Sequence, residues 1–220
     1  EDVFSDWTED DRPKAVLTFD DAYVGALTVG LEEVTARGLS ATVFVAPGLL
    51  GAEGFWWDLL APRGGDPLPQ GVRERALGSY EGDQDRVLRW ALSEGLPMTP
   101  VPAEAQPADA ALLRHAAALP GVTMASHTWG HPNLRALSAA RCREEIERGH
   151  VGLKEILGGV GTLIDWLAYP YGLESPAVVE AASDIVVGAT LVTGGLALRR
   201  GRPDPHPLRV PRVNVPRGLS

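Results

Sequence analysis

A short apolar stretch near the start of the chain stops at two adjacent carboxylates, Asp20 and Asp21. The stretch from Lys14 to Phe19 predicts a buried β-strand, and a helix is expected to follow from Ala22 to Arg37. A second buried strand is expected from Ala41 to Ala46, closed by a Pro-Gly pair. This order predicts a right-handed parallel strand–helix–strand unit. Such folds place their chemistry at the carboxyl ends of the strands, where the two aspartates lie.

The two aspartates are expected to differ in role. Neighbouring residues on a strand point to opposite sides, so one carboxylate cannot simply duplicate the other. A strand-to-helix turn offers a second interpretation, in which Asp21 caps the helix from Leu27 to Arg37 by accepting a backbone N–H. This stretch alone leaves both interpretations open.

A second group of polar residues follows another strand-like stretch, Val122 to Ala125. Two of the five histidines, His127 and His131, are four residues apart in this segment. Pro132 disfavours a helical backbone at His131, and Gly130 loosens the chain, so we expect a turn at a strand end and not a helix. Imidazoles placed in this way can converge on one metal ion. They can also be two ordinary loop histidines, but the carboxylate pair at another strand end favours the metal.

Length and composition are typical of one domain with a sizeable core, because 45% of the 220 residues are hydrophobic. No apolar run is long enough to span a membrane, and no signal-peptide pattern opens the chain. Glu1 stands in place of a starting Met, which indicates trimming, so the expected soluble protein could be exported, held at the cell surface or cytoplasmic. The net charge of −9 argues against nucleic acid as a partner and favours neutral or cationic ligands.

The single cysteine, Cys142, limits the scaffolds and metal sites that the chain can form. One thiol excludes both a disulfide scaffold and a cysteine-rich zinc site. Cys142 lies on an expected helix, and we expect it to be buried for structural reasons.

The rest of the chain continues the alternation of strands and helices, with one irregular part. Between Leu49 and Pro120 the pattern blurs, which predicts a long insertion between the second and third strands. Trp56 and Trp57 lie in this insertion and could stack on sugar rings, or could pin the insertion to the core. The alternation as a whole predicts a barrel or a doubly wound sheet. The later elements are expected at Ser138–Leu157 and Ser175–Ala182 for helices, and at Ile164–Ala168, Ile185–Leu191 and Leu208–Val215 for strands.

Three motifs follow one another along the chain: Thr18-Phe19-Asp20-Asp21, then Ser126-His127-Thr128-Trp129-Gly130-His131-Pro132-Asn133-Leu134, then Ala168-Tyr169-Pro170-Tyr171-Gly172. Together they resemble the polysaccharide deacetylase family, also called the NodB-homology domain or carbohydrate esterase family 4. The resemblance spans Lys14 to Val215 and implies an α/β fold, a distorted (β/α) barrel that usually has seven strands. It also implies metal-assisted removal of acetyl groups, mostly N-acetyl groups of amino sugars. We therefore expect one catalytic domain over residues 1–220, with residues 49–120 inserted in it.

The resemblance implies a role for each motif residue. Asp20 corresponds to the general base, and Asp21 to a metal ligand together with His127 and His131. Two histidines and one carboxylate leave coordination positions open for water and substrate, as in catalytic zinc sites. Zinc is the expected metal, and cobalt or nickel would also be accommodated. The backbone N–H of Tyr171 would help to hold the oxyanion.

The chain departs from the family pattern at two places. Many members carry an arginine two residues before the proline of the third motif, where it orients the catalytic aspartate; this chain has Ala168. Arg212, in the last expected strand, could supply that charge, because a guanidinium pairs well with a carboxylate; otherwise it is a solvated arginine. The Leu-x-His motif that supplies the general acid near the C-terminus is also absent. His206 lies nearby and could take this role, or could belong to the loop surface.

These observations favour a metal-dependent hydrolase that removes N-acetyl groups from an amino sugar or polysaccharide. Two alternatives stay open: an allantoinase-like hydrolase of a small non-sugar amide on the same scaffold, and a carbohydrate-binding protein that has lost turnover. An open groove lined by Trp56, Trp57 or Trp129 would favour a sugar, whereas a closed pocket would favour the small amide. Acetate release separates an enzyme from a binding protein.

Overall fold

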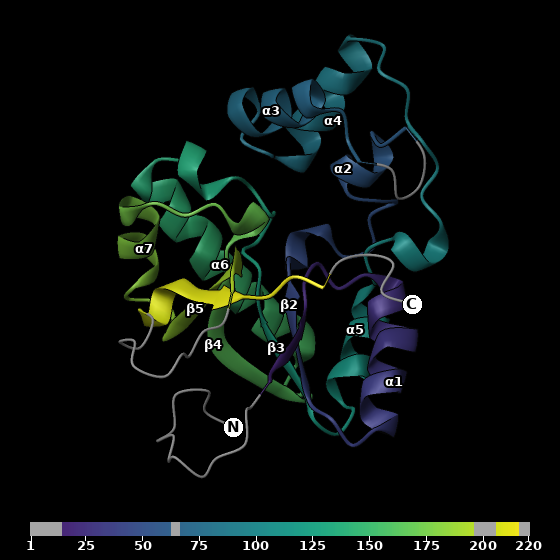
Figure 1. Cartoon of the computed structure of the whole chain (residues 1–220), viewed down its shortest axis with the longest axis vertical. Helices are drawn as coiled ribbons and strands as arrows, with labels where there is room; N and C mark the ends of the chain where they lie inside the picture. Colours follow the sequence, from purple (N-terminus) through teal and green to yellow (C-terminus); the bar gives the residue numbers. More distant parts are fainter. Residues whose placement is uncertain (1–14, 63–66, 196–205, 216–220) are drawn as a thin grey trace.

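The structure, a computed structural model, describes residues 15–62, 67–195 and 206–215. Its centre is one sheet of six parallel strands, each paired with the next strand along the chain (Figure 1). The strands are β1 (Leu17–Phe19), β2 (Ala41–Val45), β3 (Val122–Ser126), β4 (Thr162–Ala168), β5 (Gly188–Gly194) and β6 (Val210–Arg212). An order without a reversal is that of a barrel and not of a doubly wound sheet.

The sheet curls until its two edges approach each other. Arg212 on β6 donates a hydrogen bond to the hydroxyl of Thr18 on β1, with Nη1 and Oγ1 3.0 Å apart. Within the described ranges no backbone ladder joins β1 to β6, so side chains span this gap and the barrel is incomplete. The parallel α/β sheet expected from the sequence is confirmed. A seventh strand is not among the described residues and stays a prediction.

Helices pack against the strands and form the core with them (Figure 1). They are α1 (Leu31–Ala36), which continues the π-helical turn η1 (Ala26–Gly30), α5 (Ala110–Ala117), α6 (Ala139–Leu157) and α7 (Pro176–Ala182). One apolar cluster joins α1 and α5 to β2 and β3 and includes Val43, Leu113 and Met124. A second cluster joins α6 and α7 to β4 and β5 and includes Ile146 and Leu167. The alternation of strands and helices thus builds the core as the sequence predicted.

Polar side chains define where several of these helices begin. Ser138 accepts a backbone N–H at the start of α6, and Asp109 and Ser175 do the same for α5 and α7. Gly158 ends α6 in the left-handed conformation, with φ of 58°. Cys142 is buried on α6, as expected. Short 3₁₀ turns complete the described structure: η2 (Pro47–Leu49), η3 (Ala103–Ala105), η4 (Leu134–Ala136), η5 (Pro170–Gly172) and η6 (Pro207–Arg209).

Three further helices lie between β2 and β3 and stand beside one end of the sheet (Figure 1). They are α2 (Trp56–Leu59), α3 (Gln70–Ser79) and α4 (Gln84–Ser93), here called the helical extension. The extension has its own apolar cluster, which includes Trp56 and Trp90. Asn133, in the loop after β3, fastens the extension to the sheet by donating its backbone N–H to the Glu81 carbonyl (2.6 Å). That residues 49–120 are inserted relative to the family stays a prediction.

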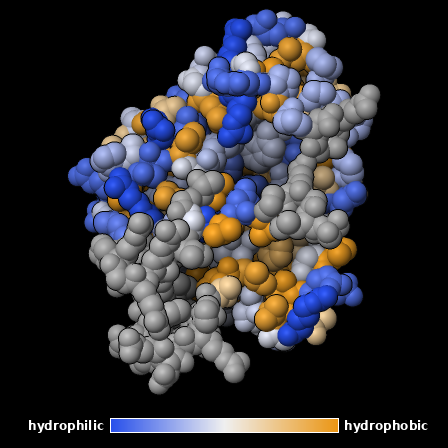
Figure 2. All heavy atoms as spheres, in the orientation of Figure 1, coloured by the Kyte–Doolittle hydropathy of each residue, from blue (hydrophilic) through white to orange (hydrophobic). Residues whose placement is uncertain are grey.

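The surface agrees with this arrangement. Figure 2 shows hydrophilic side chains over much of the helical extension in this view, as expected for a unit whose apolar residues turn inward. No helix in the described part of the chain is both long enough and apolar enough to cross a bilayer.

Candidate metal and catalytic site

Strained backbone gathers at one end of the sheet. Six non-glycine residues among those described have a positive φ angle, and five of them lie in the turns that follow β1, β3 and β4. These five are Asp21, Ala22, Thr128, His131 and Tyr171, with φ between 53° and 70°. A left-handed non-glycine residue costs about 1–3 kcal/mol and persists where its surroundings enforce it. Three strained turns at the carboxyl ends of parallel strands are typical of a functional site.

The turn after β1 separates its two aspartates. Asp21 and Ala22 are both left-handed, and the helical turn begins only after them, with Gly25 at its N-cap position and no side-chain cap. The interpretation of Asp21 as a helix cap is therefore wrong. The Ala22 carbonyl instead accepts the N–H of Ala108 (3.0 Å), which ties the turn to the segment before α5.

The turn after β3 brings His127 and His131 face to face. The Thr128 hydroxyl oxygen accepts the backbone N–H of His131 (3.1 Å), and the Glu145 carboxylate on α6 accepts that of Gly130 (2.9 Å). These bonds hold a turn and not a helix, as the sequence predicted. The Nε2 atoms of the two imidazoles are 3.1 Å apart, and both side chains are buried.

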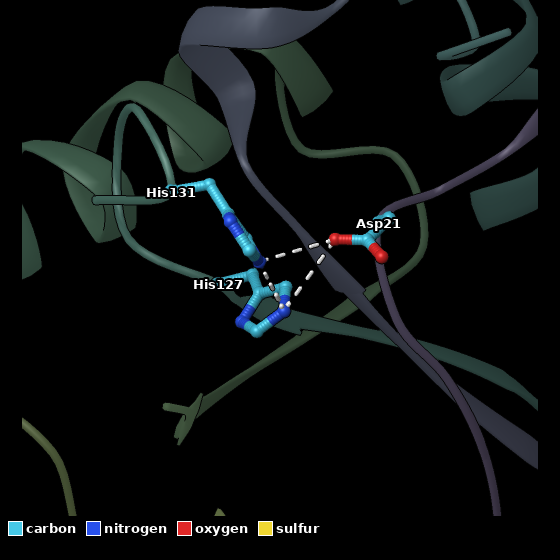
Figure 3. A group of neighbouring side chains, drawn as sticks. All are labelled: Asp21, His127 and His131. Carbon is cyan, nitrogen blue, oxygen red and sulfur yellow. Dashed lines mark hydrogen bonds and ion pairs between the residues drawn. The ribbon is translucent and has the colours of Figure 1, made fainter. Parts of the chain in front are cut away.

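Asp21 completes a cluster with the two histidines (Figure 3). Its Oδ1 atom lies 3.6 Å from Nε2 of His127 and 3.3 Å from Nε2 of His131. Ligand atoms around a tetrahedral ion with bonds of about 2.0 Å are about 3.3 Å apart, so the spacing fits a metal ion. Oδ1 of Asp21 is also buried without a hydrogen-bond partner in the described ranges, and a bound cation would supply one. The Asp–His–His cluster is therefore able to hold a divalent metal.

Burial sets the protonation states of the cluster. Burial lowers the pKa of His127, and burial together with the neighbouring His127 ring lowers the pKa of His131 well below its ordinary value. Both imidazoles are therefore neutral at pH 7, which is the form that binds metal. Nδ1 of His127 donates to the Ala168 carbonyl (2.7 Å), so Nε2 keeps its lone pair. Burial and the charge of Asp20 raise the pKa of Asp21 well above its ordinary value.

Asp20 lies beside the cluster and is held by Arg212. The guanidinium donates from Nη1 to Oδ1 and from Nη2 to Oδ2, both at 2.7 Å. Its Nε donates to the Leu191 carbonyl, and only 14% of the Arg212 side chain is exposed, so the interpretation as a solvated arginine is wrong. Burial acts to raise the pKa of Asp20, but the hydrogen bonds of Arg212, the neighbouring His127 ring and the charge of Arg212 together outweigh it and hold this pKa below its ordinary value. The ionised Oδ2 lies 4.0 Å from Nε2 of His127.

Aromatic side chains surround His131. The ring of Tyr171, in the third motif, lies 4.5 Å from the imidazole, and the ring of Trp57, in the helical extension, lies 4.8 Å from it. Trp56 is fully buried, and its Nε1 donates to the Tyr171 hydroxyl (2.9 Å). Trp56 therefore has no exposed face for a sugar ring, whereas Trp57 is partly exposed.

Two other residues of the expected site lie elsewhere. The indole of Trp129 packs so closely on Gly48 and on Gly152 of α6 that a Cβ at either glycine would approach it to 2.6 Å. His206 is exposed at the start of η6, where its Nδ1 accepts the N–H of Leu208 (3.1 Å). Within the described ranges neither side chain has a hydrogen bond, ion pair or ring contact with the Asp–His–His cluster. The role of His206 as general acid stays a prediction.

Three residues that border the site were not predicted from the sequence: Tyr23, Asp58 and Glu145. The Tyr23 hydroxyl donates to Oδ2 of Asp58 (2.8 Å) and accepts from Nε1 of Trp57 (2.9 Å). Glu145 holds the histidine turn through Gly130. The place of Tyr23 directly after the motif aspartates could have indicated it. Asp58 and Glu145 give no such indication, because their contacts join segments that are distant in sequence.

The fold and site together define an α/β protein with two features at the ends of its parallel strands. One is an Asp–His–His cluster that could hold a metal ion, and the other is the Asp20 carboxylate paired with Arg212. The sequence profile of the polysaccharide deacetylase family matches residues 8–188, which is most of the chain. The chain belongs to this family, as its three motifs predicted.

Solved structures share the fold at low sequence identity. The deacetylase PplD from Streptococcus pyogenes, in complex with acetate, matches with a TM-score of 0.56 and 16% identity, over 90% of this chain and 63% of its own. A polysaccharide deacetylase from Bacillus cereus matches with a TM-score of 0.57 and 16% identity, over 90% of this chain and 45% of its own. IcaB from Ammonifex degensii matches with a TM-score of 0.55 and 17% identity, over 92% of this chain and 67% of its own. The chain thus spans less than two thirds of the first two proteins. No curated protein sequence matches it.

Proposed function

We propose that the chain is a metal-dependent carbohydrate N-deacetylase, which hydrolyses the acetamide group of an N-acetylated amino sugar or polysaccharide. The observation that carries the proposal is the buried Asp–His–His cluster beside the Asp20–Arg212 pair. Family membership supports deacetylation, and the ligand spacing supports a divalent metal. Residues 1–220 would form one catalytic domain, with residues 49–120 as its insertion.

The cluster would hold the metal through one carboxylate and two imidazoles, from Asp21, His127 and His131. Borderline ligands of this kind suit Zn²⁺, and Co²⁺ or Ni²⁺ would also be accepted. The bound metal would polarise the acetyl carbonyl and lower the pKa of the attacking water. Three protein ligands are the number found in catalytic zinc sites, which keep a position open.

Asp20 would accept the proton of the attacking water. It is close to the cluster without belonging to it, since its Oδ2 lies 4.0 Å from Nε2 of His127. The bidentate contact with Arg212 keeps the carboxylate ionised and fixes its direction. Thr18 and Leu191 in turn hold the guanidinium. This arrangement argues against a protein that has lost turnover, because β6 supplies the charge that the third motif lacks.

Two groups from other elements would act on the substrate. The backbone N–H of Tyr171 would hold the developing oxyanion, in a turn whose left-handed φ of 59° sets the direction of the peptide group. The exposed part of Trp57 would border the sugar ring beside His131. The buried Trp56 would act indirectly, through the Tyr171 hydroxyl.

Acetate release from N-acetylglucosamine oligomers tests the proposal. The protein stripped of metal by a chelator should release no acetate, and one equivalent of Zn²⁺, Co²⁺ or Ni²⁺ should restore release. His131→Ala should lose both metal and activity, whereas His115→Ala, which changes an exposed histidine on α5, should match the wild type. Full activity of the metal-free protein or of His131→Ala would refute the metal mechanism. Metal binding without acetate release from any N-acetylated glycan would favour a binding protein instead.

A further inference from the structure

The two histidines of the cluster are oriented by different means. A metal-binding histidine usually donates the N–H of its second ring nitrogen to a carbonyl or carboxylate, which fixes the ring. His127 does so through the Ala168 carbonyl (2.7 Å). Nδ1 of His131 is buried, and no other described residue provides it with a hydrogen bond. Another kind of contact must therefore fix the His131 ring.

Aromatic packing provides that contact. The rings of His131 and Tyr171 meet edge to face, at 4.5 Å between centroids and 79° between planes, and Trp57 lies at 4.8 Å and 47°. Phe55 stacks on Trp57 at 4.5 Å and 5°, which fixes the plane of the indole. The backbone of His131 is left-handed, with φ of 56°, and such a conformation depends on its surroundings.

A hydrogen bond, here called an anchor, holds each of the two flanking rings, those of Tyr171 and Trp57. The Tyr171 hydroxyl accepts from Nε1 of Trp56 (2.9 Å). Nε1 of Trp57 donates to the Tyr23 hydroxyl (2.9 Å), which itself donates to Oδ2 of Asp58 (2.8 Å). Tyr23 follows the turn that carries the carboxylate ligand, whereas both tryptophans begin α2. The anchors therefore join the helical extension to the cluster.

We propose that the anchored rings of Trp57 and Tyr171 replace the missing hydrogen bond and orient His131 toward the metal, which makes Tyr23 and Trp57 positioning residues of the metal centre. This inference rests on the proposed metal site. It gives the helical extension a part in metal affinity, in addition to any contact with substrate. The extension and the sheet then form one site, and disturbing α2 weakens metal binding.

Metal affinity measured without substrate tests the inference. Tyr23→Phe removes the hydroxyl that joins Trp57 to Asp58 and keeps the aromatic ring. We expect the affinity for Co²⁺, measured by competition with a chromophoric chelator, to fall about tenfold, as for loss of an outer-shell partner. Trp57→Phe should cause a similar loss. The double variant should fall little further than either single variant, because both changes break the same connection.

Tyr80→Phe is the matched control. Tyr80 directly follows α3 of the extension and stacks on Trp90 of α4, with ring centroids 5.1 Å apart, and has no ring contact with the cluster in the described ranges. The Tyr80→Phe protein should bind Co²⁺ with the affinity of the wild type. The absorption spectrum of bound Co²⁺ should change in Tyr23→Phe and not in the control, because it reports ligand geometry. Unchanged affinity and spectrum in Tyr23→Phe and Trp57→Phe, with normal wild-type binding, would overturn the inference. Failure of the wild type to bind Co²⁺ would overturn the proposed function instead.

Discussion

Asp20 and Asp21 are neighbours in the chain but meet opposite surroundings. A guanidinium donates two hydrogen bonds to Asp20, whereas Oδ1 of Asp21 is buried with two imidazoles beside it and no hydrogen bond from a described residue. The left-handed backbone at Asp21 sends the two carboxylates in these different directions. An isosteric change at each position should therefore have a different consequence.

Asp20→Asn should keep the metal and lose turnover, whereas Asp21→Asn should lose both. Removing a general base lowers turnover by roughly 10²–10⁴-fold without removing a ligand. Removing a charged ligand weakens metal binding itself. Metal analysis of the purified variants, together with acetate release at saturating Zn²⁺, measures both effects. Full activity of metal-loaded Asp20→Asn would exclude Asp20 as the base.

Arg212→Lys should lower turnover while metal stoichiometry stays that of the wild type. An ammonium keeps the charge but cannot make the bidentate contact that orients Asp20. Arg209→Lys is the control, because Arg209 pairs with Glu174 through one nitrogen only among the described residues (Nη2 to Oε2, 3.0 Å), and both side chains are partly exposed. Acetate release by the two variants compares them directly. Equal turnover of Arg212→Lys and the wild type would show that charge alone suffices.

At the residue scale the sequence predicted the cluster well and its neighbours poorly. Asp20, Asp21, His127 and His131 lie together because the carboxyl ends of parallel strands share one edge of the sheet. The direction of Trp129 could not be predicted, because it depends on close contact with glycines of other elements. The same limit applies wherever a side chain is directed by a distant partner.

Helix α6 contains two glycines whose missing side chains leave room for the histidine turn. Gly149 and Gly152 lie inside this 19-residue helix, where each costs about 1 kcal/mol relative to alanine. A Cβ at Gly149 would lie 2.4 Å from the carbonyl carbon of Thr128, and one at Gly152 would lie 2.6 Å from the Trp129 ring. The two glycines thus let the turn that carries both histidines lie directly on the helix. The sequence predicted the helix itself, from Ser138 to Leu157, but not this contact.

Gly149→Ala should destabilise the protein and weaken metal binding. The gain in helix propensity is smaller than the cost of overpacking, which is about 1–3 kcal/mol, and Thr128 must move. Gly78→Ala is the control, because Gly78 lies on α3 with open space around it. It should raise the free energy of unfolding by about 0.5–1 kcal/mol and leave metal binding unchanged. Urea unfolding and Co²⁺ titration measure both quantities, and a Gly149→Ala protein as stable as the wild type would contradict the packing argument.

At the scale of the molecule, the expected alternation of strands and helices is confirmed, but the structure differs from the prediction in the bounds of the last strand and settles a sheet topology that the sequence left open. Six strands in sequential order exclude the doubly wound alternative, which the sequence left open because strand pairing is not a local property. The last strand was expected from Leu208 to Val215 and extends only from Val210 to Arg212. Pro211 has no N–H to donate, which suits the edge of a sheet but limits the length of the strand.

Metal should stabilise the whole fold, because the proposed ligands come from the ends of β1 and β3. A ligand that binds only the folded state adds about 2.7 kcal/mol at a concentration 100 times its Kd. Thermal unfolding with Zn²⁺ and with a chelator should therefore differ in Tm. His131→Ala should show no difference between the two conditions. An equal response of the variant and the wild type to Zn²⁺ would place the metal at another site.

The strand that supplies Arg212 affects how members of this family are classified as active or inactive. The guanidinium comes from β6, 192 residues further along the chain, and pairs with the aspartate for which the family resemblance led us to expect an arginine in the third motif. A census of active and inactive members that reads only that motif would count this chain among the inactive ones. What matters for Asp20 is a guanidinium beside it in space, whichever segment of the sequence supplies it. Such a census therefore has to examine the contact between β6 and the end of β1 as well as the third motif.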